Sequence, residues 1–423
     1  MVRSSVFLSL LGAAPSAQRY IPGAYMFEFE DGHDSSTLLG ALGGNGTARM
    51  HLDYKLFKGV SVQIHDVENP GEKVQSLAAL PAVKNMWHVG LYGIPDVKVS
   101  AVITPNPNFR DIEARANKTA DEPFATHVMT QVDKLRAKGI TGKGVKIAVI
   151  DSGIDYTHPA LGGCFGEGCL VSFGMDLVGD NYDGLNTPQP DNDPRDCEGH
   201  GSHVAGIIAA QPNRYGFTGA APGVTLSSYR VLGCEGGTSD DVLVAAFNKA
   251  LEDGASIISA AIGSAAGWTE QPWAVAVTRI VEQGVPCVLA AGNDGDQGLF
   301  YSASAADAKK ATAVASFDNV ITPNLLYVSR YSVDGGDEQN FAYAPATQNQ
   351  WDVTMPVYAT SPNTTIIGDA CDPLPDNTPD LNKSIVLIRR GGCLFVTKAS
   401  NAVAKGAKYI MIYNHLAGAF SPI

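Results

Sequence analysis

Apolar runs alternate with amphipathic stretches through the middle of the chain. Strand-like runs cover residues 144–150, 226–232, 257–262 and 286–291, and helical patterns cover residues 201–210, 239–253 and 274–283. Strands that alternate with helices are typical of a parallel sheet covered on both faces. The pattern predicts an α/β domain over residues 120–335 that binds its ligand at the carboxyl ends of the strands.

Two regions of different texture flank this domain. Residues 18–115 predict a small α+β unit, with strands at 24–30, 50–56 and 60–66 and a helix at 72–80. Residues 103–124, with three prolines and many polar residues, are typical of an exposed, cleavable linker. Residues 340–423 predict a β-rich domain, with strands at 353–358, 384–389 and 409–413 and a helix at 398–405.

Composition and charge narrow the class of protein. With 423 residues, 45% of them apolar and 17% charged, the chain can bury a large core and form more than one domain. The net charge is −13, and no run of Lys and Arg could follow a phosphate backbone, so we expect no nucleic-acid partner. No stretch approaches the roughly 18 consecutive apolar residues of a membrane span, so we expect no membrane insertion.

The N-terminus has the features of a secretory signal. Arg3 precedes an apolar run over residues 6–11, and small residues follow up to residue 17. This order predicts a signal peptide over residues 1–17 and a secreted product. Four triplets then match the N-glycosylation pattern, beginning at Asn45, Asn117, Asn363 and Asn382.

Seven cysteines in a secreted chain predict up to three disulfides and one remaining thiol. The pairs suggested by position are Cys164 with Cys169, Cys371 with Cys393, and Cys197 with Cys234, which leaves Cys287 free. Spacing alone leaves other connectivities open.

Two glycine-bracketed motifs carry the candidate chemistry. The first, residues 149–155, places Asp151 at the end of a predicted strand, and the second, residues 199–206, places His200 at the start of a predicted helix. A serine hydroxyl becomes nucleophilic when an imidazole removes its proton and a carboxylate fixes the imidazole's tautomer. Asp151 and His200 have the residue types and contexts for these two roles.

A third motif, Leu289-Ala290-Ala291-Gly292-Asn293-Asp294-Gly295, follows the last predicted strand of the α/β domain. An amide at such a strand end can donate a hydrogen bond to the oxyanion that forms when a carbonyl is attacked. Asn293 is the candidate donor.

Asp first, His second and a late Ser is the order of the subtilisin-like serine proteases. In its three motifs the chain resembles this family, specifically the large secreted fungal members with a propeptide and an inserted protease-associated (PA) domain. Residues 21–30 and 57–62 resemble the family's inhibitory propeptides, and residues 387–395 resemble the PA domain. The resemblance implies an inhibitory propeptide over 18–115, the N-terminal part of a catalytic domain over 120–335, and part of a PA domain over 340–423.

The same resemblance implies protein or peptide substrates held by main-chain hydrogen bonds. The matching segments are Gly236-Gly237-Thr238 and Ala261-Ile262-Gly263, with Ala290-Ala291-Gly292 lining the pocket for the residue before the scissile bond. Ala261 departs from the Ser that is common in relatives.

The family's nucleophile is expected outside these 423 residues. Gly237-Thr238-Ser239 imitates its Gly-Thr-Ser signature, but Asp240 and Asp241 follow, and Ser239 lies between His200 and Asn293 in the chain. Ser239 is therefore interpreted as a helix cap, with the two acids favouring the helix dipole. This chain alone is expected to be almost inactive, and the alternative function is a secreted peptide-binding pseudoprotease.

No metal site is readable. His200 and His203 lack the Glu of a zinc-protease helix, and the acids between residues 176 and 196 do not follow a calcium-loop spacing. His203, one turn after His200, is expected on the packing side of its helix. Relatives often bind structural calcium, which the sequence does not place.

Overall fold

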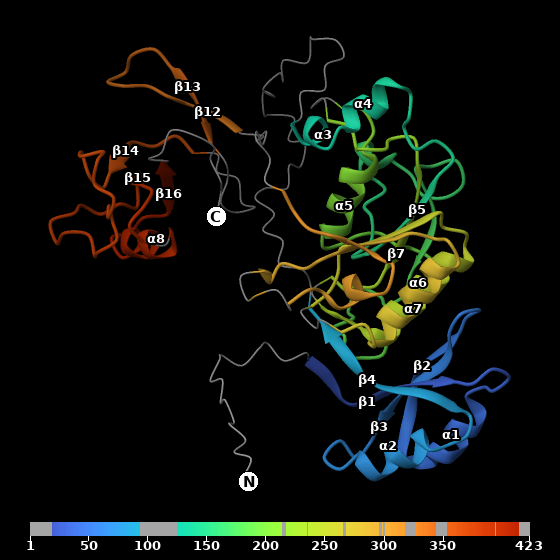
Figure 1. Ribbon diagram of the computed structural model, residues 1–423. Coiled ribbons are helices and arrows are strands. Elements are labelled where there is room, and N and C mark those ends of the chain that lie inside the picture. Colours follow the sequence, from blue (N-terminus) through green and yellow to red (C-terminus); the bar gives the residue numbers. More distant parts are fainter. Residues whose placement is uncertain are drawn as a thin grey trace, which may run out of the picture. The chain divides into compact units, whose positions relative to one another are not determined.

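The computed structural model describes residues 19–93, 125–213, 217–234, 236–264, 268–295, 298, 301–317, 327–343, 353–393 and 395–413 (Figure 1). The predicted signal peptide, the linker at 103–124 and the Asn117 triplet lie outside these residues. The chain divides into two compact units, Met1–Val97 with Ala114–Ile321 and Lys98–Glu113 with Thr322–Ile423. The first unit contains an N-terminal domain (19–93) and a central domain (125–317), and the second contains a C-terminal domain (353–413).

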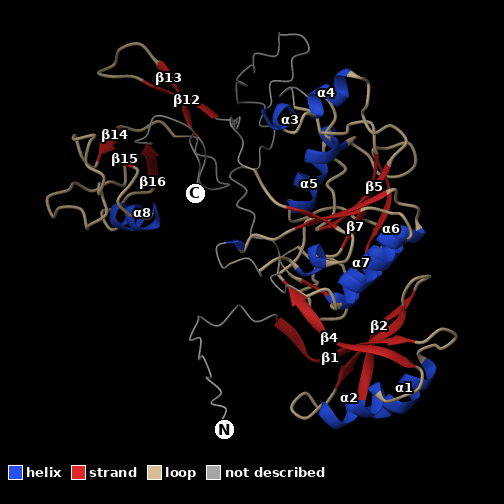
Figure 2. Cartoon of the chain, viewed as in Figure 1, coloured by secondary structure: helices blue, strands red, loops and turns tan. Residues whose placement is uncertain are grey.

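The N-terminal domain is an antiparallel sheet with helices on one face (Figure 2). Its elements are β1 (Arg19–Phe29), α1 (Ser36–Leu42), the 3₁₀ turn η1 (Gly43–Asn45), β2 (Gly46–Asp53), β3 (Lys58–Ile64), α2 (Gly71–Ala78) and β4 (Val83–Tyr92). The strand order is β2-β3-β1-β4-β8, in which β8 (Thr238–Ser239) belongs to the central domain. The predicted α+β character is confirmed, although β4 and α1 had no sequence prediction.

Alternation along β1 explains how this sheet is buried on two sides. Tyr25, Phe27 and Phe29 join the core that α1 and α2 cover. Ala24 and Met26 point the other way and join the larger core of the central domain. Because successive strand side chains face opposite sides, one strand serves both cores.

The central domain is built on a six-stranded parallel sheet of order β11-β10-β9-β5-β7-β6. The strands are β5 (Lys146–Asp151), β6 (Val171–Asp176), β7 (Thr225–Arg230), β9 (Ile257–Ala260), β10 (Cys287–Ala290) and β11 (Thr312–Val314). Its helices are α3 (Ala125–Met129), α4 (Val132–Ala137), α5 (His200–Ala209), α6 (Asp240–Glu252) and α7 (Pro272–Glu282), with 3₁₀ turns η2 (Pro159–Leu161) and η4 (Ser304–Asp307).

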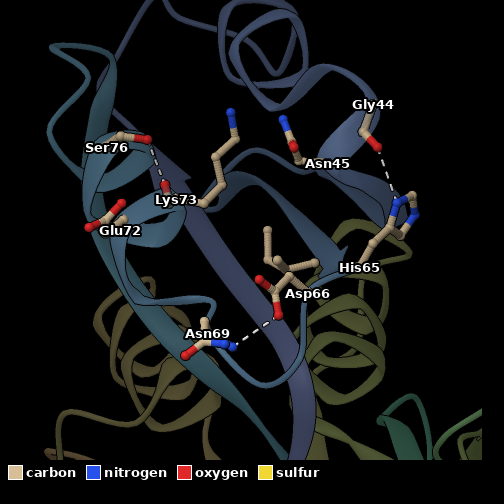
Figure 3. Close-up of a pocket in the computed structure, with 9 residues that line it drawn as sticks. Gly44, Asn45, His65, Asp66, Asn69, Glu72, Lys73 and Ser76 are labelled. Atoms are coloured by element: carbon tan, nitrogen blue, oxygen red, sulfur yellow. Dashed lines mark hydrogen bonds between the residues drawn. The ribbon is translucent and has the colours of Figure 1, made fainter.

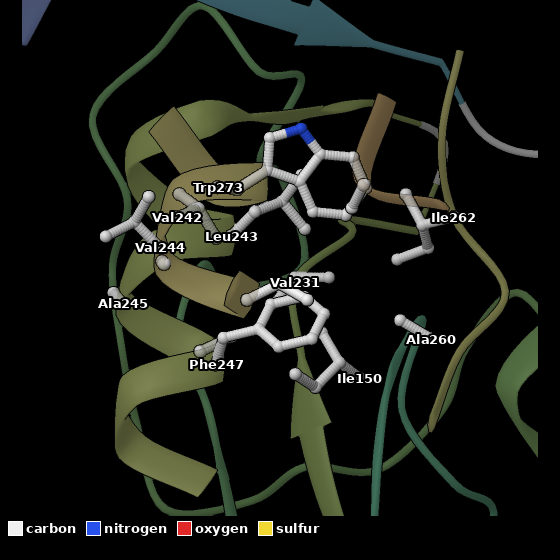
Figure 4. Packing of buried hydrophobic residues seen from close by; sticks show 14 of the residues in the cluster. Ile150, Val231, Val242, Leu243, Val244, Ala245, Phe247, Ala260, Ile262 and Trp273 are labelled. Carbon is white, nitrogen blue, oxygen red and sulfur yellow. The ribbon is translucent and has the colours of Figure 1, made fainter. Parts of the chain in front are cut away.

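Helices cover both faces of this sheet, as predicted. Ala148 and Ile150 of β5 pack in the core that contains α6 and α7. In that core Phe247 of α6 lies near Ile150, and Trp273 of α7 packs against Phe247 with ring centroids 6.0 Å apart (Figure 4). The alternate residues of β5 pack in the second core, which contains α5.

The second unit contains a hairpin and a small parallel sheet. The hairpin pairs β12 (Tyr327–Tyr331) with β13 (Gln339–Tyr343), and the sheet has the order β14 (Val357–Ala359), β15 (Ile385–Arg389), β16 (Tyr409–Tyr413) with helix α8 (Phe395–Val403). The strand predicted at 353–358 begins only at Val357, because Pro356 has no N–H to give to a ladder.

All three suggested disulfides are present: Cys164–Cys169, Cys197–Cys234 and Cys371–Cys393. Cys287 is a buried free thiol, and burial raises its pKa to about 12, which makes it unreactive. Among the described residues, no helix is both long and apolar enough to cross a bilayer.

Candidate active site

Asp151 and His200 meet at the carboxyl edge of the central sheet. Asp151 is the last residue of β5, and His200 is the first residue of α5. His200 Nδ1 lies 2.6 Å from Asp151 Oδ1, and both side chains are buried. Since a carboxylate accepts, Nδ1 carries the hydrogen and Nε2 is left to act as a base.

Asp196, which the sequence analysis did not single out, organises the loop that delivers His200. Its Oδ2 accepts from the backbone N–H and the hydroxyl of Ser202, at 2.9 and 2.6 Å. Its Oδ1 accepts from Ser152 Oγ at 3.0 Å, and Ser152 Oγ in turn accepts from Gly201 N–H at 2.9 Å. One carboxylate therefore ties the end of β5 to the first turn of α5.

Gly201 lets these two elements approach. A Cβ at this position would lie 2.1 Å from the carbonyl oxygen of Gly153 and 3.0 Å from the Cβ of Asp151. Only a residue without a side chain fits here, so the close packing of these two segments requires the glycine that follows His200.

The electrostatics of the pair favour a protonated imidazole. Burial alone would lower the pKa of His200, but the hydrogen bond and charge of Asp151, with the charges of Glu198 and Asp196, raise it above its ordinary value of 6.5. Burial likewise raises the pKa of Asp151, against the bonds it receives from His200 and Ser152 N–H. The carboxylate thus stabilises the imidazolium that a general base becomes.

The strand register brings the other candidate segments to the same edge. Ile150 of β5 and Leu289 of β10 both pair with Ala260 of β9, which lies between them. The last residue of β10 and the residues that follow β9 and β10 lie at one sheet edge: Ala290, Ala261, Ile262, Gly263, Ala291, Gly292 and Asn293. Ile262 is buried, whereas Asn293 is exposed three residues past β10, and Gly292 has the left-handed φ of +102°.

The N-terminal domain covers the third candidate segment, which contains Gly236, Gly237 and Thr238. Leu91 and Tyr92 of β4 pair antiparallel with Ser239 and Thr238 of β8. A Cβ on Gly237 would lie 2.1 Å from the carbonyl oxygen of Tyr92. An extended strand of the chain itself therefore occupies this edge.

Two sequence interpretations need correction. His203 is exposed and lies away from the buried face formed by Gly201, Ala205 and Ala209, because two residues of helix, about 200°, separate it from both Gly201 and Ala205. Ser239 does occupy the position before α6, but its hydroxyl bonds to Tyr182 and Asp241 and caps no backbone N–H.

No described group of side chains fits a metal ion. Asp180, Cys197 and Cys234 converge, but the two sulfurs form a disulfide and are not thiolate ligands.

A polar pocket lies within the N-terminal domain and has no part in this site. It is lined by Gly44, Asn45, Ile64, His65, Asp66, Asn69, Glu72, Lys73 and Ser76 (Figure 3). Several of these polar groups bond locally, such as Asp66 with Asn69 N–H at 3.0 Å.

Comparison with known proteins identifies the class that this fold and dyad suggest. The model of the subtilase family matches residues 142–376, and the PA domain model matches residues 353–422. The chain belongs to the subtilase family of serine peptidases and carries a PA domain.

Two similar proteins are proteases of Bacillus subtilis. The chain is 32% identical over 375 residues to the minor extracellular protease Vpr of Bacillus subtilis. The aligned region covers 88% of this chain and 42% of that relative. It is 36% identical over 165 residues to the major intracellular serine protease of the same species, spanning 38% of this chain and 46% of the relative. The chain thus spans less than half the length of these two relatives.

Among solved structures, fervidolysin from Fervidobacterium pennivorans, a keratinolytic enzyme related to subtilisin, is similar with 22% identity and a TM-score of 0.47. The match covers 67% of this chain and 41% of that one.

Proposed function

We propose that this chain is part of a secreted serine endopeptidase that cuts peptide bonds through an Asp-His-Ser triad. Asp151 orients His200, His200 takes the proton of a Ser supplied from outside these 423 residues, and Asn293 donates to the oxyanion. The buried 2.6 Å hydrogen bond between His200 Nδ1 and Asp151 Oδ1 carries the proposal, because it leaves Nε2 as the base.

The substrates proposed are extended peptides. One peptide strand is held between the edge at Gly236, Gly237 and Thr238 and the segment Ala261 to Gly263. Ala290 to Gly292 line the pocket for the residue before the scissile bond. The pairing of β4 with β8 supports the first of these roles, because it shows that this edge accepts an antiparallel strand.

The N-terminal domain is proposed to be an inhibitory propeptide that is removed at the 103–124 linker. Its strand β4 lies on the edge that a substrate would need, and its buried face shares the core of α6 and α7. Secretion is supported by residues 1–17 and by the disulfides, and Asn45 and Asn363 are exposed as glycosylation requires.

Turnover of a chromogenic peptide tests the proposal. The protein is expressed in a form extended in frame to include the proposed nucleophile segment, which is distinct from Gly237-Thr238-Ser239. Cleavage of the linker and peptide turnover are measured in the same samples. Activity that rises as the linker is cut is expected. A secreted, folded and processed protein without turnover would instead favour the pseudoprotease.

Replacing Asn293 with Ala should lower kcat by about 10² to 10³, the range known for subtilisin's own oxyanion amide. KM should change little, because the amide donates to a charge that exists only in the transition state. Steady-state kinetics of the extended protein measure both constants. A rise in KM at constant kcat would assign Asn293 to ground-state binding.

Replacing Glu198 with Gln should shift the acid limb of activity to lower pH. His200 works as a base only when neutral, so activity rises with pH through its pKa, and the Glu198 charge helps to raise that pKa. Gln keeps an oxygen for the His200 N–H, which now bonds Glu198 Oε2 at 2.8 Å. A downward shift of about 0.3 pH unit is expected from the pH profile of kcat/KM, while Glu282→Gln, an exposed acid on α7, should leave the profile unchanged.

A further inference from the structure

Tyr92, the last residue of β4, has its side chain fully buried against the central domain. Its hydroxyl donates to Asp240 Oδ1 at 2.7 Å, and Gln271 Oε1 lies 3.3 Å from the Tyr92 hydroxyl oxygen. Trp273 Nε1 donates to the phenol oxygen at 3.1 Å, and the two rings meet edge to face with centroids 5.6 Å apart. The phenol is thus recognised by its ring and by its hydroxyl.

The site that holds the Tyr92 ring lies at the proposed substrate edge. Tyr92 pairs with Thr238, and Leu91 with Ser239, so the main chain at this point runs antiparallel to β8. Side chains on an extended strand take fixed, alternating positions once the register is set. A peptide that lies on this edge in the same register must therefore direct one side chain to the place of the Tyr92 ring.

Asp240 depends on the N-terminal domain for the hydrogen bonds that its carboxylate receives. Gly90 N–H donates at 2.6 Å and Tyr92 at 2.7 Å, and the Asp240 side chain is almost fully buried. Burial raises the pKa of this carboxyl to about 7, so it is ionised above neutral pH. When the N-terminal domain leaves, the carboxylate loses both donors and Trp273 Nε1 loses its acceptor.

A tyrosine side chain restores the hydroxyl donor to Asp240 and the acceptor for Trp273 Nε1, whereas phenylalanine fills the space and restores neither. A site built to hydrogen-bond a hydroxyl discriminates strongly against the analogue that lacks it, because its buried polar groups are left unpaired.

We propose that Asp240 is a specificity-determining residue, which with Gln271 and Trp273 selects a tyrosine in the substrate at the position that Tyr92 takes in the N-terminal domain. This inference rests on the proposed protease function. The same site is then occupied twice in succession, first by the chain's own Tyr92 and then by a substrate tyrosine.

Matched peptide series test the selection. Chromogenic peptides carry either Tyr or Phe at each of six successive positions before the cleaved bond, and the extended, processed protein is assayed at pH 8. At one position kcat/KM should favour Tyr over Phe by about 10- to 100-fold, and Asp240→Ala should bring the ratio near one. Asp241→Asn is the control, because that neighbouring buried acid bonds Ser61 and Arg49 and not Tyr92, and it should keep the ratio.

A second measurement needs no catalysis. In the 423-residue chain, Tyr92→Phe and Asp240→Ala form a double-mutant cycle for urea unfolding, and the coupling should change the equilibrium constant by about tenfold or more. Equal cleavage of Tyr and Phe peptides, or a cycle without coupling, overturns the selection. Coupling without cleavage of any peptide overturns the protease function and leaves tyrosine recognition standing.

Discussion

Replacing His200 with Ala should abolish peptide hydrolysis, with a fall in kcat of about 10⁶, the size known for the triad His of subtilisin itself. The loss is large because the Ser hydroxyl then has no base within reach, while Asp151, at 2.6 Å from the imidazole, has nothing to orient. Asp151→Asn should cost less, about 10⁴, because the ring remains but its tautomer is no longer fixed. Turnover of a chromogenic peptide by the extended protein measures both.

His203→Ala is the matched control for this experiment. It removes an imidazole from the same helix, one turn away and on the exposed face, and should leave kcat within about twofold of the parent, as is usual for surface positions. Equal rates in the parent and the His200→Ala protein would show that the dyad does not carry the chemistry.

Replacing Arg230 with Met should destabilise the central domain by about 3–5 kcal/mol. Arg230 is buried, and its Nη1 lies 3.1 Å from Asp176 Oδ2 and 2.7 Å from Asp180 Oδ1. Met fills a similar volume but leaves the buried Asp176 carboxylate without its cation. The midpoint of urea unfolding should fall accordingly.

Two further variants separate the causes of this loss. Adding Asp176→Asn to Arg230→Met should recover part of the stability, since the uncompensated charge is then gone. Lys310→Met breaks an exposed 3.5 Å pair with Glu282 and should cost less than about 1 kcal/mol. A similar midpoint for Arg230→Met and Lys310→Met would mean that the buried ion pair contributes little.

Local patterns in the sequence were sufficient for the parallel sheet and for the dyad. The apolar run before Asp151 has the composition of a strand buried on both faces, and the observed β5 ends at Asp151, one residue past the predicted run. The glycine that follows His200 in its motif is explained by the close approach of Gly201 to the carbonyl oxygen of Gly153.

Contacts between distant segments could not be predicted in the same way. Asp240 and Asp241 look like ordinary first-turn acids in the sequence, yet Gly90, Tyr92, Ser61 and Arg49 bury and bond them from about 150 to 190 residues away. The strand β4 was missed because Lys84, Asn85 and Gly90 weaken its local strand signal, while its register is set by pairing with β1 and β8. His203 was placed on the wrong face because the buried stripe of α5, which runs through Gly201, Ala205 and Ala209, is set by packing against distant segments.

Strand β8 of the central domain completes the sheet of the N-terminal domain, so that sheet is incomplete once the two domains separate. This two-residue strand lends its backbone to a five-stranded sheet whose other members all come from residues 19–93. In the proposed maturation, separation would remove the strand partner of Leu91 and Tyr92 and expose to water the apolar surface around Met26 and Phe57. Such a fragment is prone to digestion or to self-association. Its departure would therefore be irreversible, and so would activation.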